Sequence, residues 1–363
     1  MSDVGSPPPD TSAASVAGLA QSAEDRRTAS QRQRRQELKR QQPAIEKALR
    51  AYREIDSPDT SFIRIRTEFI RTDDPRRSST REKPYSLAAD VETRPPMTRL
   101  VDRRRHSLRL LLTAFFVARM TTEPGKEFVN VWPNMPKRTG TSWLTLSGLQ
   151  RDVSPVQRRS RRRMFNTALD GLAKHSLVAL QDTNGANGRY QHFSLLDEGG
   201  RGAPYKVPGD DLPAKAAISI PTDFFRQGWH LVLTDHELVT YLAVIDRTGY
   251  LSRWDRSGDI RDLGVDLKKS VRYPTYGISD EAYTSVHQLH QFGLIEVEDP
   301  MPNRWNPRPH FPRAIAETGA EDLGGDGEKE EPLERLPYRL IYPPREGAIF
   351  PPAPERVLGF LPQ

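Results

Sequence analysis

The segment from Leu144 to Leu180 constrains the fold of this chain more than any other, because helix, turn and strand patterns follow one another within it. Phe165, Leu169 and Leu172 recur at i, i+4 and i+7, the spacing of one apolar helix face. The Asn/Gly-rich stretch that follows is typical of a β-hairpin turn. The segment therefore predicts, in order, a short helix over Leu144–Asp152, a turn at Val153–Pro155, a long helix over Gln157–His175 and a two-stranded hairpin.

The same order of elements is expected again later in the chain. Before the first set, His106–Met120 is apolar nearly all round, which predicts a buried helix. In the second set, Thr234 and Glu237 have the spacing of a capping box, which predicts the start of another helix. The remaining predictions for this set are a helix over Asp280–Phe292, a strand containing Leu294, Ile295 and Val297, and its partner strand over Leu336–Tyr342.

Two consecutive units that each end in a helix, a short turn and a hairpin resemble winged-helix proteins. The passages that carry the resemblance are Ala173–Val178 (AKHSLV) and Gln291–Glu296 (QFGLIE), which are similar to the passage from helix to strand in winged-helix transcription factors. A tandem pair in one chain is similar to the plasmid replication initiators built from two winged helices, over residues 101–343. The resemblance implies duplex DNA as the ligand, with a helix of each unit in a major groove about 12 Å wide.

Composition limits how much of the chain we expect in compact domains. Only 36% of the residues are hydrophobic, and there are 31 prolines and 24 glycines, whereas apolar residues approach half of an ordinary globular chain. We therefore expect a mainly α fold with small β-hairpins (α+β), built as two tandem winged-helix domains. The expected organisation begins with a disordered tail over 1–30 and a basic arm and extended connector over 31–100, which includes a helix at Pro43–Arg53 and a strand within Ser61–Ile70. A first winged-helix domain over 101–197 and a linker over 198–215 follow. The second winged-helix domain covers 216–345, with an acidic insertion at about 316–334, and a Pro-rich C-terminal tail covers 346–363.

Arginine is concentrated at the start of the long predicted helix. The stretch from Arg151 to Arg163 holds six arginines and one acid, Asp152. So dense a cluster repels itself unless anions are near it, and cations at a helix N-terminus also oppose the helix dipole. The cluster is either a helix face that contacts DNA or a charged face that is only solvated. The preceding turn and the following hairpin favour the DNA-contacting helix. The candidate DNA-binding residues here are Arg151, Arg158, Arg159, Arg161, Arg162, Arg163 and Asn166.

The other candidates lie in the first hairpin and in the second unit. Arg189 follows the predicted hairpin tip, where it would reach a phosphate or the minor groove; the Asn and Gly residues beside it need only satisfy the turn. The second helix begins with acids, which repel phosphate, so the alternative for this unit is dimerisation. Its candidates are Lys268, Lys269 and Arg272 as phosphate anchors, Thr284, Ser285, His287 and Gln288 as neutral groups for base edges, and Arg304 in the next loop.

Several classes of site are not supported by the sequence. The absence of cysteine excludes disulfides, thiolate metal sites and cysteine nucleophiles. His287 and His290 are three residues apart, but no third histidine or carboxylate accompanies them at a metal-binding spacing. Phosphate-binding loops, dinucleotide-binding motifs and hydrolase motifs do not occur in the sequence. We therefore expect a protein that is not an enzyme, with no metal and no cofactor, located in the cytoplasm with the nucleoid or a plasmid and not in a membrane.

Three functions are consistent with these patterns. The first is sequence-specific binding of double-stranded DNA in plasmid replication initiation at repeated origin sites, with a second copy of the chain or replication proteins as further partners. The second is a transcriptional regulator of the same architecture. The third is a scaffold whose winged helices bind proteins while the basic segments remain in solution. Because the first two bind DNA through the same surface, only the third is separable from them by a DNA-binding measurement.

Overall fold

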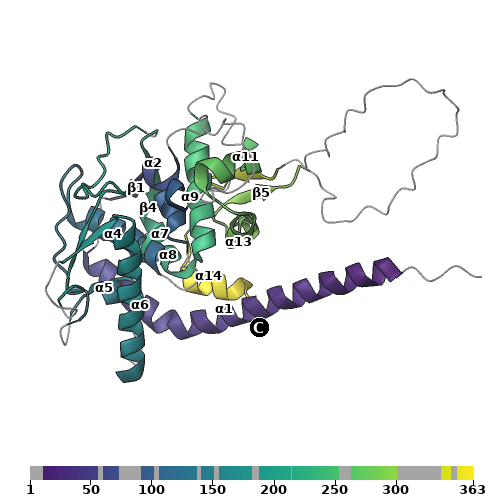
Figure 1. Ribbon diagram of the computed structural model, residues 1–363, viewed down its shortest axis with the longest axis horizontal. Coiled ribbons are helices and arrows are strands. Elements are labelled where there is room, and N and C mark those ends of the chain that lie inside the picture. Colours follow the sequence, from purple (N-terminus) through teal and green to yellow (C-terminus); the bar gives the residue numbers. More distant parts are fainter. Residues whose placement is uncertain are drawn as a thin grey trace, which may run out of the picture.

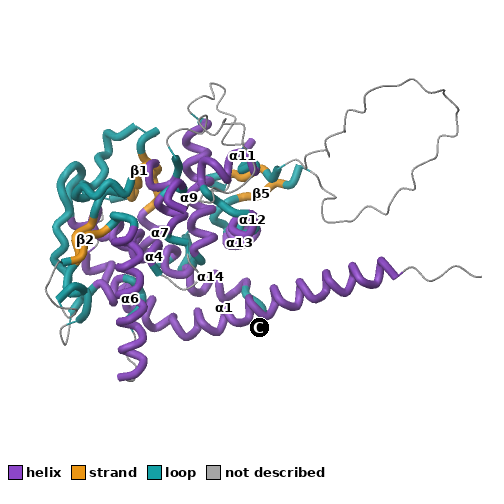
Figure 2. Tube along the Cα trace, in the orientation of Figure 1, coloured by secondary structure: helices purple, strands orange, loops and turns teal. Residues whose placement is uncertain are grey.

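The computed structural model describes residues 11–55, 60–72, 91–101, 106–136, 140–150, 155–181, 188–213, 215–252, 263–300, 337–344 and 350–363 (Figures 1 and 2). Its longer helices are α1 (Thr11–Ile55), α4 (Ser107–Thr121), α6 (Pro155–Lys174), α9 (Asp235–Leu251), α13 (Val286–Phe292) and α14 (Ala353–Phe360). Short helices are α2 (Thr67–Ile70), α3 (Pro96–Arg99), α5 (Trp143–Leu146), α7 (Thr222–Arg226), α8 (Trp229–Val232), α11 (Lys269–Val271) and α12 (Asp280–Tyr283), with a 3₁₀ turn over Val91–Thr93 and a π-helical turn over Arg272–Tyr276. The strands are β1 (Phe62–Arg66), β2 (Val178–Leu180), β3 (Phe193–Leu195), β4 (Ala217–Pro221), β5 (Glu296–Glu298) and β6 (Arg339–Ile341).

The fold is mainly helical, with three small antiparallel sheets of two strands each in the described residues, so the coarse fold class is as expected. Strands β2 and β3 pair with Val178 opposite Leu195, and β5 pairs with β6 with Val297 opposite Leu340. The second of these pairs confirms that the partner strand of β5 lies far downstream, close to Leu336–Tyr342. The acidic insertion at about 316–334, between these two strands, lies outside the described residues.

The sheet of β1 and β4 was not expected, and it changes the domain boundaries. Ile63 lies opposite Ile220 and Ile65 opposite Ile218, so a segment predicted to be a connector pairs with the start of the second unit. All four isoleucines are buried, which supplies the free energy that this long-range pairing requires. The predicted strand over Ser61–Ile70 is shorter than expected, because α2 begins at Thr67. Residues 60–72 therefore belong to the folded core.

A single hydrophobic core extends through both units, which differs from two domains with separate cores. Helix α4 lies at its centre and is buried on nearly every side, as its composition predicts. Phe116 of α4 stacks on Phe225 of α7 with ring centroids 5.3 Å apart, and its edge meets Tyr52 of α1 at 5.0 Å. Each of these aromatic pairs joins segments that the sequence had placed in different parts of the molecule. Their burial explains why the domains cannot be drawn as separate units.

Helix α1 is much longer than the predicted helix over Pro43–Arg53 (Figure 1). It begins at Thr11, so the prediction of a disordered tail over 1–30 differs from the structure from that residue onward. Ala44, Ile45, Ala48 and Tyr52 are buried against the core, while the polar stretch before Pro43 has few apolar residues. That stretch is fixed by long-range polar contacts, which no local periodicity reveals. Arg34 pairs with Glu237 of α9 at 2.6 and 2.8 Å, and Arg35 donates to the carbonyl oxygen of Leu358 at 2.6 Å.

The expected linker and C-terminal tail also contribute to the core. Tyr205 and Val207 are buried within the predicted linker, and the amide of Phe128 donates to the carbonyl oxygen of Tyr205 at 3.0 Å. Near the C-terminus, α14 buries Ala353 and Val357 against α1 and α8. Figure 1 shows the C-terminus lying beside α1. Both segments are rich in glycine or proline, so their composition concealed the few apolar residues that anchor them.

The two units have the same sequence of elements near their ends. Helix α9 begins with the predicted capping box, in which Glu237 and Thr234 bond to each other's backbone amides. The long predicted helix of the first unit is α6, whereas the second is divided into α12 and α13, and the short helix predicted over Leu144–Asp152 ends at Leu146. Helices α6 and α13 are each followed by a residue with positive φ, Ser176 at 54° and Gly293 at 80°. The next amide then bonds five residues back in both units, which is the Schellman arrangement.

Candidate nucleic-acid interface

The basic helix α6 is anchored by its second half and exposed along its first. Phe165, Ala168, Leu169 and Leu172 are buried, which holds the C-terminal half of α6 against the core. Val156 is 75% exposed, and no described residue before Phe165 in this helix is buried. Figure 1 shows α6 crossing α1 and continuing beyond it. The first turns of α6 therefore form a projecting helical segment.

The arginines on this projecting segment differ in their contacts. Arg161 is 17% exposed, lies 4.0 Å from Glu37 of α1 and donates toward the sulfur of Met164 at 3.9 Å. Arg159, Arg162 and Arg163 are exposed and form no ion pair with any residue that the structure describes, and Arg158 is exposed as well. Arg151 lies outside the described residues. Arg161 is thus a contact between helices, whereas the arginines around it present charge to solvent.

Asn166 and Arg189 lie closer to the body of the protein. Asn166 is half-buried, and its Oδ1 has no hydrogen-bond partner within the described parts of the chain. The guanidinium of Arg189, half of which is exposed, lies 3.5 Å from Asp170 of α6 and 5.8 Å from the ring of Tyr190. The Tyr190 hydroxyl is 2.9 Å from both oxygens of Asp170. These contacts hold the segment before β3 beside α6, while the hairpin tip at 182–187 lies outside the described residues.

The predicted phosphate anchors of the second unit are engaged in internal ion pairs. Arg272 is almost buried, pairs with Asp280 and lies over the ring of Tyr283 at 4.6 Å, and burial lowers the pKa of its guanidinium. Lys269 also pairs with Asp280, at 3.2 Å. The prediction that Arg272 anchors a phosphate is therefore corrected, because its side chain is enclosed by the rings of Tyr273 and Tyr283 and by Asp280. Lys268 is 44% exposed and lies 4.0 Å from Asp266.

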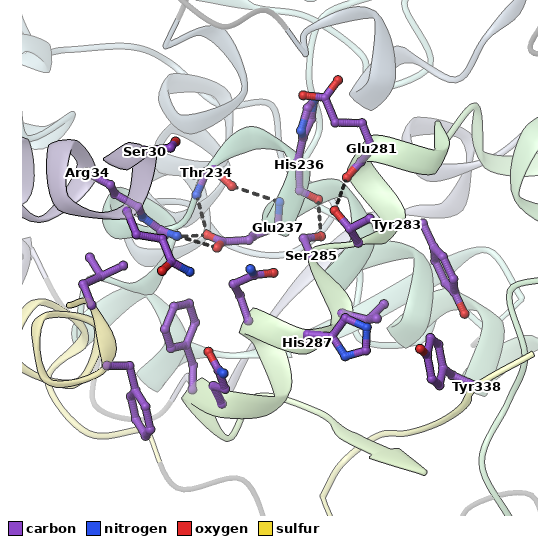
Figure 3. A pocket seen from close by; sticks show the side chains of 18 residues that line it. Ser30, Arg34, Thr234, His236, Glu237, Glu281, Tyr283, Ser285, His287 and Tyr338 are labelled. Atoms are coloured by element: carbon purple, nitrogen blue, oxygen red, sulfur yellow. Dashed lines mark hydrogen bonds and ion pairs between the residues drawn. The ribbon is translucent and has the colours of Figure 1, made fainter. Parts of the chain in front are cut away.

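Of the predicted base-contacting residues of the second unit, one is buried and three line a partly open cavity. Ser285 is buried, and its hydroxyl donates to the carbonyl oxygens of Ala282 at 2.5 Å and His236 at 3.2 Å, so it is not available to a base edge. Thr284, His287 and Gln288 lie along a cavity of about 620 Å³ between α13, α14 and α1, which Figure 3 shows from close by. The ring of His287 meets Tyr338 edge-on at 5.0 Å. Arg304 lies outside the described residues.

A second cavity, of about 640 Å³, is lined by Arg34, the cation of the ion pair with Glu237. His106 and Arg109 of the first unit line it together with Asp235 at the start of α9. Burial, and to a smaller extent the positive charges of Arg109 and Arg161, lower the pKa of the His106 imidazole to about 3. Arg161 of α6 thus contributes to the lowered pKa of His106.

Exposed cations on α1 lie within the segment that the sequence identifies as a basic arm, for which DNA contact and a solvated arm are equal alternatives, but none of them was named as a candidate residue. Lys39, Arg40 and Arg50 are exposed on the face of α1 opposite its buried residues. The signal that would have found them is a 3.6-residue period of cations on the polar side of a helix, but the expected helix began only at Pro43. The ion pair between Arg34 and Glu237 was equally invisible, since its partners are far apart in sequence.

The described residues contain no group of three or more His, Asp or Glu side chains placed to hold a metal ion. Among the helices that the structure describes, none has both the length and the apolar composition needed to cross a bilayer. Comparison with protein families, with curated protein sequences and with solved structures returned no match.

Proposed function

We propose that this chain binds double-stranded DNA through the exposed arginines in the first half of α6. The observation that carries this proposal is the set Arg159, Arg162 and Arg163, which are exposed on a projecting helix and form no ion pair with the described residues. Uncompensated like charges so close together raise the free energy of the free protein. Phosphates lower it again, because each neutralised phosphate also releases counterions.

The shape of the helix supports a major-groove contact. An α-helix with its side chains is about 10–12 Å wide, and the major groove of B-DNA is about 12 Å wide. The ten residues from Pro155 to Met164 extend about 15 Å, which exceeds the groove depth of about 8.5 Å. Arg189 is held beside α6 by Asp170, which supports a contact with the sugar-phosphate backbone at the edge of the groove. In this proposal the arginines of α6 contact base edges, and Arg189 contacts a phosphate.

The repeated order of helix, turn and hairpin supports a tandem winged-helix architecture as part of the same proposal. The Schellman turns after α6 and α13 lead into hairpins of the same antiparallel kind. Because the cations near α13 are paired and its polar residues border a cavity, we assign protein contact to the second unit, with a second copy of the chain or a replication protein as partner. The first unit then supplies the DNA affinity.

Replication initiation at repeated origin sites is the activity that we propose for this DNA binding, and transcriptional regulation is its alternative. Two units in one chain favour an assembly on repeated sites, since one unit contacts DNA and the other a neighbouring copy. The test is replication of a marker circle that carries several copies of a target sequence selected for binding, with the protein supplied in trans. Replication that depends on the protein supports initiation, whereas altered transcription without replication supports the regulator.

DNA binding itself is tested by titrating the purified protein into labelled duplexes at several salt concentrations. If about five phosphates are neutralised, log K against log[salt] should have a slope of about −4.5. A target duplex selected from random sequence should bind more tightly than an unrelated duplex. Binding that is undetectable, or that does not change with salt, would falsify the proposal and leave the scaffold hypothesis in its place.

A further inference from the structure

The exposed face of α1 carries an excess of positive charge along its second half. Leu38, Ile45 and Tyr52 mark the face that is buried in the core. On the opposite face, between residues 32 and 54, cations outnumber acids by five to two; the exposed charged residues are Arg32, Lys39, Arg40, Glu46, Arg50, Arg53 and Glu54. Arg32 donates to the carbonyl oxygen of Gln363 at 3.0 Å and is therefore occupied. We call Lys39, Arg40, Arg50 and Arg53 the α1 basic stripe.

Most of this charge has no ion-pair partner among the described residues. Lys39 and Arg50 form no ion pair or side-chain hydrogen bond with any residue of the described ranges. Arg40 is 67% exposed and reaches Glu37 only at 4.0 Å, and Arg53 donates to the carbonyl oxygen of Leu49 in its own helix at 3.4 Å. A helix face with this imbalance is destabilised by repulsion between its own side chains. An anionic partner along the face removes that cost.

The position of the α1 basic stripe beside α6 identifies the partner. Glu37, which lies 4.0 Å from Arg161, is three residues before Arg40, so Arg40 of the stripe lies on the side of α1 that α6 crosses (Figure 1). From Lys39 to Arg53 a helix extends about 21 Å. A duplex presents one phosphate charge for about each 1.7 Å of its axis, counting both strands, so phosphates are available along the whole stripe.

We propose that the α1 basic stripe binds the phosphate backbone of the same duplex whose groove α6 enters. This inference rests on the proposed function and adds a second contact element to it. Lysine and arginine side chains on a helix that lies along the backbone contact phosphates without reading bases. The stripe therefore supplies affinity that is independent of sequence, while α6 supplies the discrimination between sequences. An acidic protein surface is the other polyanion such a stripe could hold, and the experiment below separates the two.

The test compares the wild-type protein with the double variant Lys39→Gln/Arg50→Gln on a selected target duplex and on an unrelated duplex. Loss of two phosphate contacts should make the slope of log K against log[salt] shallower by about 1.8 on both duplexes. The ratio of the two dissociation constants should stay within about twofold of wild type, because phosphate contacts carry no sequence information. A matched control, Lys126→Gln/Lys206→Gln, removes two exposed lysines from loops away from α1 and should leave the slope unchanged.

The outcomes separate this inference from the proposed function. If the wild type binds with a steep slope and Lys39→Gln/Arg50→Gln keeps that slope, the stripe does not contact DNA, although the proposed function stands. If the control Lys126→Gln/Lys206→Gln makes the slope of log K against log[salt] as shallow as the α1 variant does, the effect is one of net charge. The inference is again overturned in that case. If the wild type does not bind duplex DNA, both fall together. Thermal unfolding of each variant should match wild type, since all four side chains are at the surface.

Discussion

Helices α6 and α13 occupy equivalent places in the two units, yet they use charge in opposite ways. Both end in a Schellman turn and lead into an antiparallel hairpin. Around α6, Arg159, Arg162 and Arg163 face solvent without an ion pair in the described residues. Before α13, by contrast, Asp280 forms ion pairs with both Lys269 and Arg272. The same order of elements therefore does not imply the same surface.

The difference separates cations that are paired inside the protein from cations that are exposed without an ion pair in the described residues, and under our proposal the second kind binds DNA. A guanidinium enclosed by tyrosines and paired with a carboxylate fixes a turn, and its removal should change stability. A guanidinium without a partner costs free energy in the free protein, and its removal should change binding. Variants of the α6 arginines and of Arg272 test this division, because the first should change DNA affinity and the second should change the free energy of unfolding.

The largest effect is expected for Arg159→Ala combined with Arg163→Ala in α6. Two base- or phosphate-contacting arginines contribute together roughly 2–6 kcal/mol to DNA affinity. The double variant should lose that much in fluorescence-anisotropy titrations at fixed salt, while its unfolding midpoint stays at the wild-type value. Lys268→Ala in the second unit is the matched control and should bind normally. Normal binding by the α6 variant would show that α6 is not the contact helix.

The next effect is expected on stability, from Arg272→Ala. The substitution removes the ion pair with Asp280 and the contacts with Tyr273 and Tyr283, and it should lower the free energy of unfolding by about 1–3 kcal/mol. DNA affinity of the folded variant should stay within about threefold of wild type. Chemical denaturation and DNA titration measure the two quantities on one preparation. Weakened DNA binding at unchanged stability would mean that the second unit also binds DNA through this residue.

Acid should destabilise the first unit through His106. The pKa of His106 falls from an ordinary value near 6.5 to about 3 in the folded protein, so the unfolded chain binds a proton first. The stability that follows from the neutral imidazole is present above pH 6.5 and is lost as the pH falls toward 3. One such group changes the free energy of unfolding by about 1.4 kcal/mol per pH unit in this window.

The measurement is denaturant unfolding at pH 7 and pH 5, for wild type and His106→Gln. Between these two pH values the wild type should lose roughly 2 kcal/mol more than the variant, since only the wild type carries this histidine. The comparison between pH values removes any constant cost of the substitution itself. An equal loss in both proteins would contradict the assignment of a depressed pKa to His106.

The smallest effect is expected from exchanging the residues of the two equivalent turns. Ser176 has φ of 54° and Gly293 has φ of 80°, both in the left-handed region where glycine is favoured. Ser176→Gly should raise the free energy of unfolding by a few tenths of a kcal/mol to about 1 kcal/mol, and Gly293→Ser should lower it by about 1 kcal/mol. The Cβ of a new residue at Gly293 would meet only Arg356, at an ordinary 3.7 Å, so backbone conformation decides the effect. Opposite signs from those expected would show that the two turns are not equivalent.

Local patterns predicted the elements of each unit well. The apolar period of Phe165, Leu169 and Leu172 placed α6 within two residues of its bounds, and the capping box of Thr234 and Glu237 placed the start of α9. Hairpins after α6 and α13 were also predicted, including the distant strand β6. These features depend on contacts between neighbours in sequence or on a repeated apolar pattern. The sequence is therefore sufficient to specify them.

The site was predictable only in part. The exposed arginines of α6 were candidates because six arginines fall within thirteen residues, and charge density is visible in a sequence. That Arg272 is buried and paired was not predicted, since this depends on its packing against Tyr283 and on the position of Asp280. The extent of α1 was missed for the same reason. Its polar first half carries no apolar period and is fixed by contacts such as Arg34 with Glu237.

By itself, then, the sequence determined the helices and hairpins of the two units and the concentration of arginine at the start of α6. Only the tertiary structure decided which cations are neutralised, that β1 pairs with β4, and that α1 and α14 close one shared core. The physical reason is the range of the interactions. Helix periodicity and capping act over a few residues, whereas the ion pair of Arg34 with Glu237 and the pairing of β1 with β4 join segments more than a hundred residues apart, and such partners are known only once the chain has folded.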